Sequence, residues 1–141
     1  PLRDLIETKP SLQVILNHYG RLEGGPGKFE TALDCWPTTL QWLQDQPQTV
    51  ITLSGLIDPS DAGQFDDWDL PEAHFKPKLA DLMAIFGEDR ILFSSNWPMG
   101  LMTASFEDTL DLLTALIEAL SPTSLAKIMG LNAARCYRIE S

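Results

Sequence analysis

The stretch that decides the fold is residues 90–98, which read RILFSSNWP. A short and almost wholly apolar run passes at once into polar and turn-forming residues. Two earlier runs have the same form, LQVIL at residues 12–16 and TVITL at residues 49–53. Short apolar runs that are bounded by turn signals are typical of strands buried on both faces, as in a parallel sheet.

Helical patterns lie between these runs. Residues 37–46 have helical spacing of apolar residues. Asp69 and Glu72 have the spacing of a capping box, and Pro77 is expected to interrupt the segment that they begin. We therefore expect a second helix to start near Pro77 and to end at Gly87, which suits a C-terminal cap.

After the third run the pattern is helical to the end. Ser105 and Asp108 mark a helix start, and the expected apolar stripe consists of Leu110, Leu113, Ile117 and Leu120. A further helix is expected from Ser121-Pro122 to Gly130, followed by a last turn or two over residues 132–137. The order strand, helix, strand, helix, strand and two helices predicts an α/β fold of parallel strands with right-handed crossovers.

The composition of the chain argues against some classes of binding partner. The 141 residues include 10 Lys or Arg and 20 Asp or Glu, which gives a formal net charge of −10. This balance argues against nucleic acid and against anionic membrane surfaces as partners, because both demand a basic surface. No apolar run is long enough to cross a bilayer. Cys35 and Cys136 have no metal-site spacing, and we expect them to be buried free thiols in the cytoplasm rather than a disulfide.

Two loops stand apart from the helices and strands. Residues 21–28 are rich in glycine and are expected to form a mobile connection. Residues 58–72 hold six acidic residues and no Lys or Arg. A solvated acidic loop is the expected structure there, and a cation site is the alternative, although the spacing does not match an EF-hand.

The polar residues that follow the three runs are the candidate site. In parallel α/β folds, function collects at the carboxyl ends of the strands. The residues found there are Asn17, His18, Ser54, Ser94, Ser95, Asn96 and Trp97. A histidine in this place can bind a metal, polarise a carbonyl or shuttle a proton, and it can also simply complete a hydrogen bond at the strand end. No nucleophile-elbow or phosphate-loop motif is present.

Four motifs in order carry a resemblance to a known family. Residues 15–20 (ILNHYG), 53–56 (LSGL), 90–98 (RILFSSNWP) and 131–137 (LNAARCY) resemble segments of the amidohydrolase-related superfamily of metal-dependent hydrolases. The branch is the one that contains sugar-lactone and pyrone-dicarboxylate lactonases. The resemblance implies a (β/α)8 barrel, of which residues 1–141 form the C-terminal part with about three strands, because a whole barrel needs about 250 residues. Such a domain is incomplete on its own.

The resemblance also implies roles for individual residues. His18 is the catalytic residue that would bind metal or polarise the carbonyl, and Asn96 is the catalytic residue that would orient water or substrate. Asn17, Ser54 and Trp97 would contact the substrate. The implied cofactor is one divalent metal, Zn or Mn. Three departures from the family pattern bear on it: the family's His-x-His pair is absent, Asn96 stands where an Asp often binds metal, and Thr52 stands where the family often has Lys.

The leading hypothesis is thus a hydrolase of a small lactone or related carbonyl compound, active when the full barrel is present, with the isolated chain inactive. The rival is a truncated, non-catalytic remnant or pseudoenzyme that only binds a ligand or partner. A small self-contained domain of flavodoxin type usually needs five strands, and only three are expected here. Open sheet edges lead us to expect self-association or a missing N-terminal half-barrel as the partner.

Overall fold

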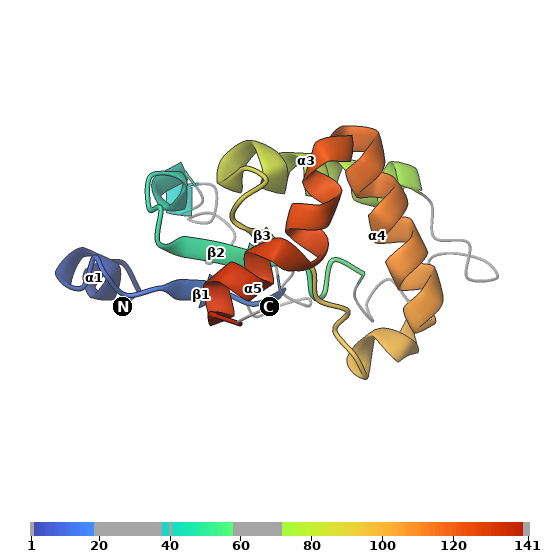
Figure 1. Cartoon of the computed structure of the whole chain (residues 1–141), viewed down its shortest axis with the longest axis horizontal. Helices are drawn as coiled ribbons and strands as arrows, with labels where there is room; N and C mark the ends of the chain where they lie inside the picture. Colours follow the sequence, from blue (N-terminus) through green and yellow to red (C-terminus); the bar gives the residue numbers. More distant parts are fainter. Residues whose placement is uncertain (1, 19–37, 40, 58–71, 140–141) are drawn as a thin grey trace, which may run out of the picture.

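The three expected strands form one parallel sheet in a computed structural model that describes residues 2–18, 38–39, 41–57 and 72–139. The strands are β1 (Val14–Leu16), β2 (Thr49–Thr52) and β3 (Ile91–Leu92), and they lie side by side in that order. Val14 pairs with Thr49, and Ile51 pairs with Ile91. Because both pairings are parallel, all three carboxyl ends reach the same edge of the sheet (Figure 1).

Helices flank the strands and follow them. Their bounds are α1 (Leu2–Thr8), α3 (Glu72–Phe86), α4 (Phe106–Leu120) and α5 (Asn132–Tyr137), with helical residues also at 38–39 and 41–44. The 3₁₀ segments are η4 (Met99–Met102) and η5 (Pro122–Ser124), and η6 (Lys127–Leu131) is a π-helix. Neither α1 nor η4 was predicted from the sequence pattern. The observed α/β architecture is otherwise the expected one.

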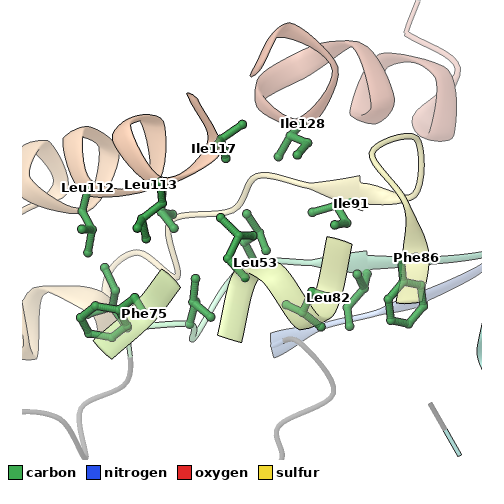
Figure 2. Packing of buried hydrophobic residues seen from close by; sticks show 14 of the residues in the cluster. Leu53, Phe75, Leu82, Phe86, Ile91, Leu112, Leu113, Ile117 and Ile128 are labelled. Atoms are coloured by element: carbon green, nitrogen blue, oxygen red, sulfur yellow. The ribbon is translucent and has the colours of Figure 1, made fainter. Parts of the chain in front are cut away.

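The hydrophobic core lies between the sheet, α3 and α4. Phe75, Leu82 and Phe86 project from α3 toward Leu113 of α4 and toward the strand residue Ile91 (Figure 2). These side chains are nearly or fully buried. Because β2 is buried along its whole length, the continuous apolar run at residues 49–53 is explained by packing on both of its faces.

One expected helix break is absent. Pro77 lies inside the continuous helix α3 rather than at a helix start. Proline lacks a backbone N–H, so the carbonyl of Ala73 loses one intrahelical bond. The buried residues Phe75 and Leu79 on either side of Pro77 hold the helix against the core. Tertiary packing therefore outweighs the local preference of proline.

A second expected break, at Gly130, is also absent. Gly130 lies within η6, and the helical path continues into α5. The backbone N–H of Asn132 bonds the carbonyl of Lys127, which is the i→i+5 pattern of a π-helix. The Asn132 side chain donates to the carbonyls of Glu88 at 2.7 Å and Ile91 at 2.8 Å. This anchor to β3 fixes the path of the chain past Gly130.

The other helix signals are mostly correct. The hydroxyl of Ser105 accepts the backbone N–H of Asp108 at 3.0 Å, so Ser105 is the N-cap of α4. Gly87 follows α3 with a φ of +67° and bonds the carbonyl of Met83. The apolar stripe of α4 is rotated from the expected one: its buried members are Thr109, Leu112, Leu113, Leu116 and Ile117.

Arg90 joins the ends of two helices just before β3. Its guanidinium donates to the carbonyls of Ile85 and Phe86 at the end of α3, and to those of Leu43, Gln44 and Gln46 near the helical residues 41–44. Burial lowers the pKa of Arg90. The five hydrogen bonds to carbonyl groups match the five N–H donors of a guanidinium. Arg90 therefore has a structural role, which is to cap the carbonyl groups at the ends of these two helical segments.

Several expectations lie outside the described residues. These are the glycine-rich segment 21–28, the acidic segment 58–71, Asp69 and Cys35. Cys136 carries a free thiol, as expected, but it is half-buried rather than buried. Burial raises the pKa of the Cys136 thiol. Within the described part of the chain, no helix is both long and apolar enough to cross a membrane.

Candidate functional site

His18 and Ser54 meet at the carboxyl edge of the sheet. The Nδ1 atom of His18 lies 3.0 Å from the Ser54 hydroxyl. The backbone N–H of His18 donates to the hydroxyls of Thr52 and Ser54, each at 3.2 Å. The ends of β1 and β2 are thus joined by side chains as well as by the strand ladder, and the structure brings Ser54 and His18 together.

Thr52 is the member of this cluster that was not among the predicted site residues. Its hydroxyl lies 3.0 Å from that of Ser54 and 3.5 Å from Oδ1 of Asn17. Thr52 and Ser54 are both 5% exposed. A signal for Thr52 exists in the sequence: it precedes Ser54 by two residues at the end of a strand, and alternate residues of a strand share a face. We call Asn17, His18, Thr52 and Ser54 the His18 cluster.

The backbone at the strand ends is left-handed at both catalytic candidates. His18 has a φ of +57° and Asn96 a φ of +59°. In the described ranges only one other non-glycine residue, Arg138, has a positive φ. This conformation is uncommon outside glycine, and such outliers gather at functional sites. The chain therefore turns sharply off β1 and off the β3 segment at the two residues that the motifs singled out.

Glycine at position 55 suits the backbone conformation next to His18. Gly55 has a φ of +76°, which a side chain would strain. A Cβ at this position would lie 3.5 Å from Cβ of His18 and 3.6 Å from its Nδ1. Because both distances are ordinary van der Waals contacts, the backbone angle rather than the space around His18 selects glycine here.

Asn96 and Trp97 form a separate part of the same edge. The Asn96 carbonyl accepts the backbone N–H of Gly100 at 2.9 Å, and the described residues offer no hydrogen bond between Asn96 and the His18 cluster. Trp97 is 68% exposed. It lines a shallow surface depression, partly open to solvent, with Ser95, Gly100, Leu101, Ala104, Ser105, Phe106 and Thr109.

The described residues do not assemble a metal site. No group of three or more His, Cys, Asp or Glu side chains among them is placed to hold an ion. Zinc sites use three or four such ligands. His18 would supply one ligand, but its neighbours in the cluster are hydroxyls and a neutral amide. The donor set that the described ranges contain therefore does not fit a divalent metal.

Comparisons with known proteins agree with this architecture. A family model described as amidohydrolase matches residues 2–139. The chain belongs to this family. A curated L-fucono-1,5-lactonase of Burkholderia multivorans is 33% identical over 135 residues, which is 89% of this chain and 43% of that protein. A curated uncharacterised protein of Sinorhizobium fredii is 26% identical over 136 residues, 96% of this chain and 42% of that protein.

A solved structure of a family member shows the same arrangement. The crystal structure of an amidohydrolase from Burkholderia multivorans, with bound Zn, is 29% identical and superposes with a TM-score of 0.74. The match covers 99% of this chain and 48% of that one. Our chain thus spans a little under half the length of the amidohydrolase relatives it matches. Its three parallel strands are part of a (β/α)8 barrel, as the resemblance implied.

Proposed function

We propose that this amidohydrolase-family chain contributes to the active site of a hydrolase that opens a small lactone or a related carbonyl substrate. The observation that carries the proposal is the His18 cluster: an imidazole whose Nδ1 lies 3.0 Å from the buried Ser54 hydroxyl, which in turn contacts the buried Thr52 hydroxyl, at the carboxyl ends of parallel strands. Active sites of barrels of this type lie at that edge. The lactonase name of a 33% identical relative supports the cyclic ester as the substrate.

The chemistry follows from the groups present. Hydrolysis of a lactone requires water to attack the carbonyl carbon, and negative charge then develops on the carbonyl oxygen. We assign His18 to proton transfer with the attacking water or to polarisation of the carbonyl. Asn96 is a neutral amide, so it orients water or substrate by hydrogen bonds and does not accept a proton.

The remaining assigned residues bind substrate. Asn17 and Ser54 present hydrogen-bonding groups beside His18, and these groups suit the hydroxyls of a sugar lactone. Trp97 presents an exposed indole at the rim, which suits an apolar face of the ring. The cytoplasm stays our expected compartment, and the small-molecule substrate our expected partner.

The test is a hydrolysis assay on the protein translated from its complete reading frame. A panel of sugar lactones and aromatic lactones is followed by acid release, with and without a chelator. We expect turnover of at least one lactone, and a loss of about 100-fold or more in kcat/KM in His18→Asn. His74→Asn, which changes the other histidine of this chain, is the control and keeps the wild-type rate.

Each outcome of this assay decides something. Activity that a chelator abolishes would place a metal with ligands from outside the described residues, since those residues form no such group. Activity that resists the chelator would assign the chemistry to His18 alone. An absence of turnover on the whole panel would contradict the proposal and favour the rival, a remnant that only binds a ligand or partner.

A further inference from the structure

We infer that Gly100 and Ser95 are positioning residues that hold the backbone on both sides of Asn96 and so fix the direction of its carboxamide. Both residues act through Asn96, and neither is assigned a contact with the reacting atoms. The effect on catalysis rests on the proposed function, whereas the backbone geometry is independent of it.

The direction of the Asn96 side chain is set by its backbone. In the part of the chain that the structure describes, the Asn96 carboxamide has no hydrogen-bond partner that could orient it. Asn96 has a φ of +59°, and residues other than glycine, asparagine and aspartate rarely adopt this left-handed conformation. Such a conformation persists only where neighbouring contacts hold it. The contacts of the two peptide groups that flank Asn96 therefore decide where the carboxamide points.

Gly100 meets both of these peptide groups. Its N–H donates to the Asn96 carbonyl at 2.9 Å, which holds the peptide group after Asn96. A Cβ added at Gly100 would lie 2.9 Å from the carbonyl oxygen of Ser95, which belongs to the peptide group before Asn96. This distance is shorter than real Cβ contacts, and the obstructing atom is backbone. Any side chain at Gly100 would therefore push the Ser95 carbonyl and rotate the backbone at Asn96.

Gly100 is not free to move away from such a contact. Its carbonyl accepts the N–H groups of Thr103 at 2.9 Å and of Ala104 at 3.0 Å. Gly100 and Ala104 are both buried. The next residue, Ser105, is the N-cap of α4. Gly100 is thus fixed to the start of α4, and the position of that helix reaches Asn96 through it.

Ser95 holds the peptide group after Asn96 from its other end. The backbone N–H of Trp97 donates to the Ser95 hydroxyl at 3.3 Å. The peptide group between Asn96 and Trp97 is therefore bonded twice, through its N–H to Ser95 and through its carbonyl to Gly100. Because a rotation of this group would break at least one of these bonds, the two bonds together hold the turn at Asn96.

The first experiment measures the backbone without any assay of activity. Asn96→Gly and Asn96→Ala both remove the carboxamide, but glycine alone tolerates a left-handed backbone without strain. In the protein translated from its complete reading frame, we expect a lower melting temperature for Asn96→Ala than for Asn96→Gly. Adding Gly100→Ala to both variants should narrow this difference, because the backbone is then no longer held at a positive φ. Adding Gly130→Ala, the matched control whose Cβ would meet nothing within 4 Å, should leave the difference unchanged.

Two results of this experiment would overturn the inference. One is equal melting temperatures of Asn96→Ala and Asn96→Gly, and the other is a difference that Gly100→Ala leaves unchanged. Ser95→Ala provides a second background that decides the matter where Gly100→Ala does not fold. It should narrow the same difference, whereas Ser95→Thr, which keeps the hydroxyl, should not.

The second experiment tests whether this backbone acts on catalysis through Asn96. On the lactone found above, Gly100→Ala should lower kcat by about 10-fold or more with little change in KM, because a misdirected group loses contacts that it makes in the transition state. In Asn96→Gly, which lacks the carboxamide, Gly100→Ala should lower kcat no further. Gly130→Ala should keep the wild-type kcat, and Ser95→Thr should keep most of the rate that Ser95→Ala loses.

The two experiments separate this inference from the proposed function. Equal losses of kcat from Gly100→Ala in the wild type and in Asn96→Gly would refute the positioning role, since a purely structural effect does not need the carboxamide. An inactive wild type that shows the expected pattern of melting temperatures would refute the proposed function alone.

Discussion

Glu88 is the residue that ties the turn before β3 to the C-terminal helices. Its carboxylate accepts hydrogen bonds from the Ser124 hydroxyl and from Lys127 Nζ. The bond from Lys127 and then that from Ser124 lower the pKa of Glu88 below 4.5. The same pair raises the pKa of Lys127 above 10.5. Asp89 adds a second ion pair to Lys127, at 3.0 Å.

The directions of these shifts predict a pH dependence of stability. Because the pKa of Glu88 is lowered in the folded state, its contribution is present above 4.5 and is lost as the pH falls through the folded pKa. The contribution of Lys127 is present below 10.5 and is lost as the pH rises through its raised pKa. Glu88→Gln should therefore lower the melting temperature at pH 7 and have little effect in strong acid. Glu118→Gln, which changes an exposed acid of α4, is the control. If Glu88→Gln lowered the Tm equally at both pH values, the stabilising role of the Glu88–Lys127 ion pair would be contradicted.

For single residues, the sequence predicted which side chains lie close together better than it predicted what each side chain does. The meeting of His18 with Ser54 followed from the rule that parallel strands end at one edge, and the structure shows it at 3.0 Å. Thr52 was not predicted as a site residue, because a threonine within an apolar run satisfies strand propensity without any further role. The expected neighbourhood of Asn96 with His18 depends on how the chain leaves β3, which a left-handed residue and η4 decide. Strand order alone does not contain that information.

Helix α3 is continuous although it contains a proline in its interior. Pro77 removes the hydrogen bond to Ala73 and lies at an exposed position, while the buried side of the helix packs on the core. The sequence pattern of α3 predicted two helices because the helix-breaking effect of a proline can be recognised from the neighbouring residues. The packing of Phe75, in contrast, depends on residues that are distant in the sequence. The same reason explains η6, whose path past Gly130 is fixed by the Asn132 contacts to β3.

Replacement of this proline should stabilise the protein. Pro77→Ala restores a donor to the Ala73 carbonyl, and the gain should be about 1–2 kcal/mol, below the ~3 kcal/mol cost of an interior proline because the unfolded chain gains freedom. Chemical denaturation measures it. Pro122→Ala is the matched control, since Pro122 begins η5, where proline is favoured, and no gain is expected. A destabilised Pro77→Ala variant would show that the ring itself contributes packing.

At the scale of the whole molecule, the two outermost strands of the sheet, β1 and β3, differ in what covers their outer sides. The outer edge of β3 is occupied by the C-terminal helices: the Phe93 N–H donates to the carbonyl of Ile128 at 2.8 Å, and Asn132 bonds the carbonyl of Ile91. Among the described residues, the outer edge of β1 has no partner strand. An unpaired edge is a template for another strand, so addition to this sheet is open at β1 rather than at β3.

The surface beyond β3 adds a second reason to expect association. Five large apolar side chains within ten residues are 44–68% exposed: Trp97, Met99, Leu101, Met102 and Phe106. Apolar side chains gathered in this way are typical of contact surfaces. In Figure 1 this segment, which precedes α4, lies on the opposite side of the molecule from α1.

We propose that a polypeptide of residues 1–141 associates with itself or with the half-barrel that completes its relatives. Sedimentation equilibrium should give a mass that rises with concentration above the 15.7 kDa of one chain, because burial of exposed apolar area lowers the free energy of the associated state. Met102→Lys should weaken this association, since Met102 is 59% exposed within the apolar segment. Ile139→Lys is the matched control, at 62% exposed but outside that segment. A folded monomer at every concentration would contradict the prediction, and equal effects of the two lysines would show that general charge, not the apolar segment, governs it.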